Sequence, residues 1–212
     1  SKRDANEERS TNSDLFTYSL ATGETRKITV NPAYDGSPLY SPDGKTIAYR
    51  AQIRPGYESD RFRLMLYDRA NGRHRSLSEE LDRWVDSFAW APDSRTIYFI
   101  AEDRGRTRIF RVSVTGNQVC MLPGEISAAD LCVTPDGRSL VFTKSSMHQP
   151  AEICSSATDG SGLAARTRHN DALLSGLEMR PAEEFWFDGA GSAKGTPKIH
   201  SWILKPPHFD AA

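Results

Sequence analysis

Apolar and polar positions alternate in short runs along most of this chain, and three of these runs follow the same turn sequence. The copies read SPDGKTIAY at 41–49, APDSRTIYF at 91–99 and TPDGRSLVF at 134–142. Short alternating runs predict β-strands with one buried face. Proline fixes φ, while Asp and Gly favour reversal of the chain, so each copy predicts two strands joined by a tight turn. The structural turn residues are Pro42, Asp43, Gly44, Pro92, Asp93, Pro135, Asp136 and Gly137.

A second hairpin, with a glycine-containing turn, follows each Pro-Asp hairpin. In the first copy, residues 63–68 turn through Asn71 and Gly72 into residues 74–77. Each repeat therefore predicts four antiparallel strands, and the repeats begin 50 and 43 residues apart. Four-stranded units at this spacing are typical of a β-propeller.

The expected fold is all-β: a partial β-propeller of about three and a half four-stranded antiparallel blades, similar to TolB and WD40 propellers, with a short C-terminal extension. The blades are expected at about 37–78, 86–122 and 128–167, with half a blade at 15–30. Propeller rings usually close with about 4–8 blades. We therefore expect residues 1–170 to be part of a larger propeller.

Large aromatic residues occupy alternating positions in the predicted strands, where rings fill the space between blades. The predicted core aromatics are Tyr49, Tyr67, Trp90, Phe99, Phe110 and Phe142. Trp84 and Trp202 are not included, because each borders a loop or the domain junction.

The pattern changes after residue 170. Residues 171–179 predict a short helical or irregular connection, and two new strands are expected at 184–187 and 198–204. Two prolines, Pro206 and Pro207, follow the second strand, and proline cannot donate to a sheet ladder. Residues 171–212 are therefore expected to be a linker and the first strands of another domain.

Charge and composition exclude several partners. The chain has 27 basic and 28 acidic residues and a formal net charge of −1, so no electrostatic attraction to nucleic acid is expected. No apolar run approaches the roughly 18 residues of a membrane span, and the polar N-terminus has no signal-peptide pattern. The three cysteines lack metal-ligand spacing, and no metal or cofactor is expected. The cellular compartment stays open.

Three segments, together with the Pro-Asp repeats, resemble the prolyl oligopeptidase (S9) family of serine peptidases. They are RPGYESDRFRLMLYD at 54–68, VDSFAWAPDSRTIYFIAED at 85–103, and EEFWF with KIHSWILKPPHFD between 183 and 210. The dipeptidyl-peptidase and acylaminoacyl-peptidase branch is the most similar. The resemblance implies a propeller that covers an α/β-hydrolase domain and limits its Ser-Asp-His site to short peptides or acyl-peptides. It also implies that residues 183–210 form the junction and the first hydrolase strands.

No catalytic residue is predicted within the chain. A nucleophile elbow requires Gly-x-Ser-x-Gly, which does not occur, and the Gly/Ser stretch at 189–195 has the wrong spacing around Ser192. The five histidines show no ligand pairing. We therefore expect the chain to have no peptidase activity by itself, although the protein containing it would be a serine peptidase.

One loop carries a functional hypothesis. Residues 51–61 form the first long loop on the face opposite the Pro-Asp turns, and a carboxylate beside an aromatic ring suits a peptide's amino terminus. The candidate substrate-binding residues are Arg54, Tyr57, Glu58 and Asp60. The alternative is a structural ion-pair network formed by Glu58, Asp60, Arg61 and Arg63.

A different class of function stays open: a TolB-like propeller that serves as a protein-interaction module. The segment at 183–210 argues against it, because a propeller that stands alone does not need this extension. A propeller enzyme with a site in its own channel has no clustered acids or ligands to support it. The expected partners are the protein's own hydrolase domain, a peptide substrate, and a second copy paired through exposed blade flanks.

Overall fold

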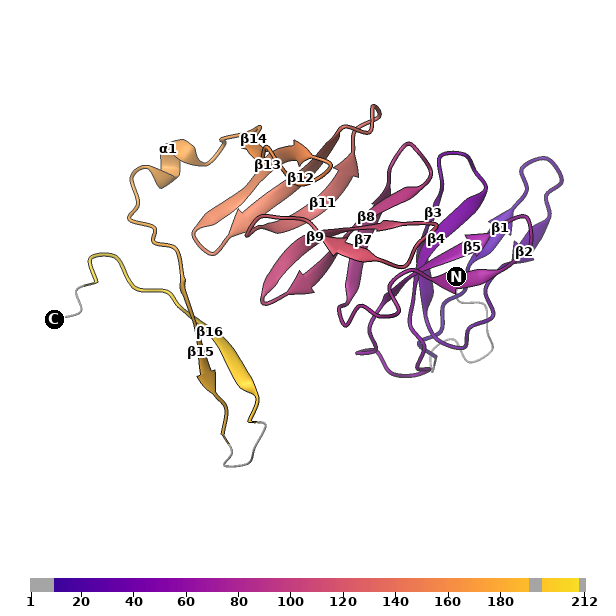
Figure 1. Cartoon of the computed structure of the whole chain (residues 1–212), viewed down its shortest axis with the longest axis horizontal. Coiled ribbons are helices and arrows are strands. Elements are labelled where there is room, and N and C mark those ends of the chain that lie inside the picture. Colours follow the sequence, from indigo (N-terminus) through magenta and orange to yellow (C-terminus); the bar gives the residue numbers. More distant parts are fainter. Residues whose placement is uncertain (1–9, 191–195, 210–212) are drawn as a thin grey trace.

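The computed structural model describes residues 10–190 and 196–209, and nearly all of its regular structure is β-strand. Three four-stranded antiparallel sheets follow one another along the chain, and a two-stranded hairpin lies at each end of the row (Figure 1). Each four-stranded sheet is a meander in which consecutive strands pair. The predicted partial β-propeller is therefore confirmed.

The strand bounds follow the predicted repeats. The first full sheet contains β3 (Asp35–Tyr40), β4 (Thr46–Ala51), β5 (Arg63–Asp68) and β6 (His74–Ser76). The second contains β7 (Val85–Trp90), β8 (Thr96–Asp103), β9 (Arg106–Ser113) and β10 (Val119–Met121). The third contains β11 (Ser127–Val133), β12 (Ser139–Ser146), β13 (Gln149–Ala157) and β14 (Ala164–Ala165). The N-terminal half-unit pairs β1 (Phe16–Tyr18) with β2 (Thr25–Lys27).

The Pro-Asp turns have the same local geometry in all three sheets. The residue after Asp has a positive φ in each: 69° at Gly44, 57° at Ser94 and 70° at Gly137. The preceding Asp accepts a backbone N–H bond from two residues further along, as at Asp43 and Lys45 (3.1 Å). Positive φ favours glycine, so Ser94 adopts a conformation that is costly for its residue type.

The core lies between neighbouring sheets. One cluster, which includes Leu64, Val85, Ile97 and Phe99, fills the space between the first and second sheets. Another, which includes Ile100, Leu140 and Phe142, lies between the second and third. Five of the six predicted core aromatics are at most 5% exposed: Tyr49, Tyr67, Phe99, Phe110 and Phe142. The sixth, Trp90, is half-buried against the first cluster.

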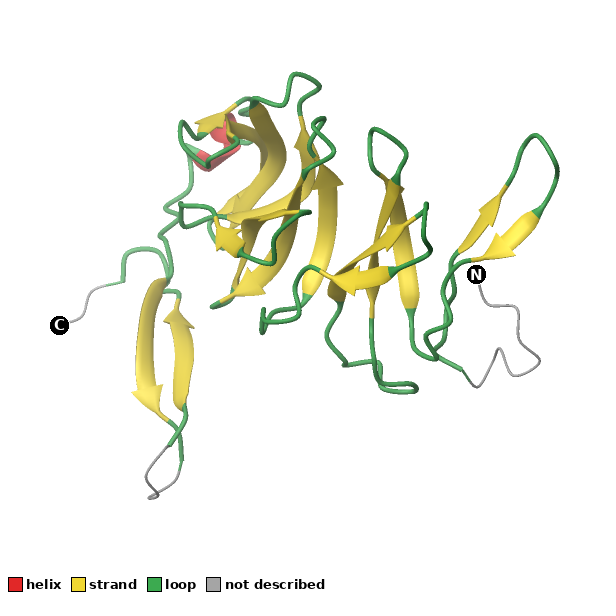
Figure 2. Ribbon diagram, turned by 45° about the vertical axis from the view of Figure 1, so that its right-hand side comes forward, coloured by secondary structure: helices red, strands yellow, loops and turns green. Residues whose placement is uncertain are grey.

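The C-terminal part begins with one short helix, α1 (Asp171–Leu174), and continues to the hairpin of β15 (Glu183–Asp188) and β16 (Lys198–Ile203). Figure 2 shows this hairpin beside the sheets rather than within them. It contacts the β8–β9 turn, where the Trp202 ring lies against Gly105 and Arg106 pairs with Glu184 at 2.9 Å. Its assignment to a second domain stays a prediction. In the Gly/Ser stretch at 189–195, residues 191–195, including Ser192, lie outside the described residues.

Candidate functional site

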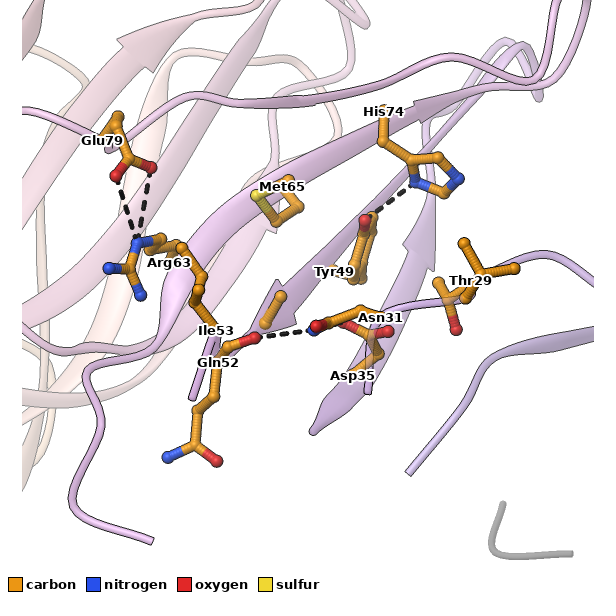
Figure 3. A pocket seen from close by; sticks show the side chains of 12 residues that line it. Thr29, Asn31, Asp35, Tyr49, Gln52, Ile53, Arg63, Met65, His74 and Glu79 are labelled. Carbon is orange, nitrogen blue, oxygen red and sulfur yellow. Dashed lines mark hydrogen bonds and ion pairs between the residues drawn. The ribbon is translucent and has the colours of Figure 1, made fainter. Parts of the chain in front are cut away.

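A cavity of about 300 Å³, which we call the flank pocket, opens on the face of the first full sheet nearest β1 and β2 (Figure 3). The segment after β2 supplies one side of the pocket, and strands β3 to β6 supply the other. Its apolar lining includes Val30, Ala51, Ile53 and Met65. Its polar lining includes Asp35, Tyr49 and His74, so the pocket combines apolar walls with ionisable groups.

Asp35, at the start of β3, is only 1% exposed. Its Oδ1 accepts a hydrogen bond from the Asn31 side-chain amide at 3.0 Å. Its Oδ2 is buried and has no hydrogen-bond partner within the described part of the chain. Burial raises the pKa of Asp35 to about 6, and the side chains of Asn31 and Thr29 offset this only in part. The carboxyl group therefore becomes protonated at a higher pH than a solvated aspartate.

Tyr49 and His74 project toward each other from β4 and β6 (Figure 3). A hydrogen bond of 2.8 Å joins the Tyr49 hydroxyl and His74 Nδ1. Burial, and then the charge of Asp35, raise the pKa of Tyr49 far above its usual value. Burial lowers the pKa of His74, so both groups are neutral at pH 7.

The loop at residues 51–61 adjoins the flank pocket, because Gln52 and Ile53 also line the cavity. Asp60 organises the start of this loop. Its Oδ2 accepts the backbone N–H groups of Ile53 (2.7 Å) and Arg54 (3.0 Å), and it lies 3.6 Å from Arg63. Burial alone would raise the pKa of Asp60, but these bonds and the positive charge of Arg63 lower it overall. Asp60 therefore holds the loop's conformation.

The other three candidate residues lie nearer the tip of the loop. Tyr57 is 48% exposed, and the Arg54 guanidinium carbon lies 5.5 Å from the centre of its ring. The Glu58 side chain is exposed, while its backbone carbonyl accepts a bond from Gln52 Nε2 at 3.0 Å. The structure thus brings Arg54 and Tyr57 together and leaves the Glu58 carboxylate accessible.

Arg61 and Arg63 form an ion-pair network, but with Glu79 in place of the predicted Glu58. Glu79 lies 3.4 Å from Arg63 and 3.6 Å from Arg61, and Arg63 also contacts Asp60. In the described residues, Glu58 makes no ion pair in this network. Asp60, Arg61 and Arg63 therefore have structural partners.

The polar groups of the flank pocket are not evident from the sequence pattern. The sequence pattern predicts Tyr49 as a core aromatic, gives His74 no ligand pairing and does not single out Asp35. Asp35 precedes a predicted strand, so only its burial against Asn31 and Thr29 distinguishes it from a solvated acid. No local sequence signal reveals that burial.

Within the described residues, no group of three or more His, Cys, Asp or Glu side chains is placed to hold a metal ion. Cys120, Cys132 and Cys154 are free thiols. In the same part of the chain, no helix has the length and apolar character needed to cross a membrane.

Comparison with characterised proteins identifies relatives among peptidases. The chain is 32% identical over 203 residues to dipeptidyl-peptidase 5 of Porphyromonas gingivalis, and the match covers 95% of this chain. Over 202 residues it is 29% identical to dipeptidyl-peptidase 5 of Schizosaccharomyces pombe. It spans only 29% and 28% of the lengths of these two relatives. No protein-family model matches the chain.

Solved structures share the fold. Acylaminoacyl peptidase of Pyrococcus horikoshii superposes with a TM-score of 0.69 at 18% identity, over 91% of this chain and 28% of that protein. TolB from Acinetobacter baumannii superposes with a TM-score of 0.58 at 20% identity, over 76% of this chain and 39% of that protein. At these identities the superpositions establish the propeller fold alone.

Proposed function

We propose a role for this chain as a propeller region of the prolyl oligopeptidase (S9) peptidase family. In this role it is the non-catalytic part of a serine peptidase and limits access to the active site. In this proposal the chain forms one side of a chamber above a hydrolase domain. The Ser-Asp-His site of that domain would cleave short peptides or acyl-peptides. The observation that carries the proposal is the similarity to a dipeptidyl-peptidase over 95% of the chain.

The residues of the chain are consistent with a role without catalysis. The sequence contains no Gly-x-Ser-x-Gly motif, which the nucleophile elbow of such a hydrolase requires. The β15–β16 hairpin has an apolar face with exposed Phe185, Phe187 and Ile199. We assign this face to contact with the hydrolase domain, because an exposed apolar patch favours a packed partner.

The loop at 51–61 is the proposed point of contact with peptide. Glu58 supplies an accessible carboxylate for the amino terminus of a substrate, and Arg54 and Tyr57 supply a paired cation and ring beside it. Asp60 acts indirectly, because its bonds to the backbone hold the loop in place. A charge-assisted hydrogen bond to an ammonium group contributes about 1.5–3 kcal/mol.

Glu58→Ala in the longer peptidase tests this contact. We expect kcat/KM for a dipeptide amide with a free amino group to fall about tenfold or more, with little change for the N-acetylated analogue. Glu80→Ala, at another exposed acid, is the matched control and should leave both values unchanged. Equal kcat/KM values for wild type and Glu58→Ala with the free amine would overturn the assignment.

We also propose that copies of this chain associate through exposed flanks. Large apolar side chains in and beside the third sheet are exposed, namely Met147 (60%), Ile153 (43%) and Leu163 (45%), and an exposed apolar patch favours association. Sedimentation velocity over a range of concentrations would detect the dimer, and a strictly monomeric chain would contradict it.

A further inference from the structure

We infer that the flank pocket binds a small organic ammonium ion with an apolar carbon skeleton, with Asp35 as its charge partner. This site adjoins the proposed peptide contact but differs from it: the pocket lies between the segment after β2 and the first full sheet, while Tyr57 at the loop tip is exposed. The inference does not depend on the peptidase role.

The first support is the unpartnered oxygen of Asp35. The residue is only 1% exposed, and Oδ1 accepts a hydrogen bond from Asn31. Oδ2 accepts none in the described chain, because the nearby Thr29 hydroxyl donates to Asp14. A buried charged group without a partner is strongly unfavourable, and a buried polar atom without a hydrogen bond is unusual in a folded protein. A ligand ammonium group would supply both the hydrogen bond and the compensating charge.

The second support is that the nearby charged groups have other partners. Lys27 pairs with Asp14 at 2.7 Å. Arg63, further along the lining, contacts Glu79 and Asp60. His74 bonds to Tyr49, and burial lowers its pKa, so it is neutral at pH 7. In the described part of the chain, none of these basic groups forms an ion pair with Asp35. The carboxylate of Asp35 therefore gives this part of the pocket a net negative charge.

The third support is the apolar remainder of the pocket. Ala51 and Met65 line its interior, while Val30 and Ile53 are largely exposed at its rim. Met65 is unbranched and adapts to irregular shapes. A volume of about 300 Å³ is at the lower end of the range for small-molecule sites. The pocket therefore suits one ammonium group on a compact apolar body and disfavours anions.

The test compares 2-phenylethylamine with 2-phenylethanol, which has a hydroxyl in place of the ammonium group. Isothermal titration calorimetry at pH 7.5 should give saturable, sub-millimolar binding of the amine and affinity for the alcohol about tenfold or more lower. Asp35→Asn should reduce amine affinity to that of the alcohol. Asp82→Asn, at an exposed acid, should leave it unchanged. Equal affinities for amine and alcohol, or no saturable binding of the amine, would overturn the inference.

A second measurement requires no variant. Between pH 7.5 and pH 5 the amine stays protonated, whereas Asp35 becomes largely neutral and His74 moves toward its charged form. Amine affinity should therefore fall about tenfold, while affinity for the alcohol stays constant. A pH-independent amine affinity would contradict a charge partner at Asp35.

The same titration on a polypeptide extended to the length of the relatives should retain binding. Loss of binding there would show that other residues fill the pocket.

Discussion

The Ser94 hydroxyl oxygen accepts a hydrogen bond of 3.0 Å from the backbone N–H of Asp43. The two residues lie in the Pro-Asp turns of neighbouring sheets, so this bond joins one sheet to the next at the same edge. Ser94 also has a φ of 57°, a conformation that glycine adopts at much lower cost. The residue therefore combines an unfavourable backbone conformation with a contact between sheets.

Two substitutions at Ser94 separate these effects. Ser94→Ala loses the hydrogen bond and keeps the positive φ, so we expect the free energy of unfolding to fall by about 1 kcal/mol. Ser94→Gly loses the same bond but relieves ~1 kcal/mol of backbone strain, so its stability should be close to that of wild type. Urea unfolding followed by circular dichroism measures both. A glycine variant less stable than the alanine variant would contradict this account.

Gly105→Ala tests how the C-terminal hairpin is attached. A Cβ at this position would lie 2.3 Å from Trp202 Cη2, so the ring must move. Gly72→Ala is the matched control, since Gly72 has nearly the same φ (72° against 69°) and no atom within 4 Å of the added Cβ. Both variants should lose about 1–2 kcal/mol of stability from the positive φ. Only Gly105→Ala should accelerate amide hydrogen exchange in β15 and β16. Equal exchange in the two variants would show that Trp202 does not hold the hairpin.

Because the Asp35 carboxyl is buried, we expect the free energy of unfolding to depend on pH in an unusual way. Its pKa is raised from 3.8 to about 6, so the folded state favours the protonated carboxyl. The contribution of this group to stability is complete below pH 3.8 and is lost as the pH rises through about 6. At ~1.4 kcal/mol per pKa unit, the ionised group destabilises the fold at pH 7 by on the order of 3 kcal/mol.

Asp35→Asn removes that charge. The new amide N–H without an acceptor costs ~1 kcal/mol. We therefore expect a net gain in the free energy of unfolding on the order of 1–2 kcal/mol at pH 7, and a smaller gain at pH 4.5. Urea unfolding at the two pH values measures the difference, with Asp82→Asn as the control for an exposed acid. A variant less stable than wild type at pH 7 would contradict the buried, unpartnered carboxylate.

The strands and turns were predictable because their determinants are local. The Pro-Asp sequence and the alternation on either side specify each hairpin, and the spacing of the copies specifies the sheets. The flank pocket was not predictable, because Asn31, Asp35, Tyr49 and His74 meet only after the four strands β3 to β6 have paired. The exposed loop was located correctly, but the structural role of Asp60 depends on backbone N–H groups of Ile53 and Arg54 that sequence patterns do not reveal.

The most direct test of the proposed function compares the peptidase activity of this chain with that of a polypeptide as long as its relatives. The purified 212-residue chain and a polypeptide extended to the length of its dipeptidyl-peptidase relatives would be assayed with a dipeptidyl p-nitroanilide and labelled with a serine-directed fluorophosphonate. We predict that the chain neither hydrolyses the substrate nor becomes labelled, and that the longer polypeptide does both. Turnover by the purified chain, or a longer polypeptide that is neither active nor labelled, would contradict the account.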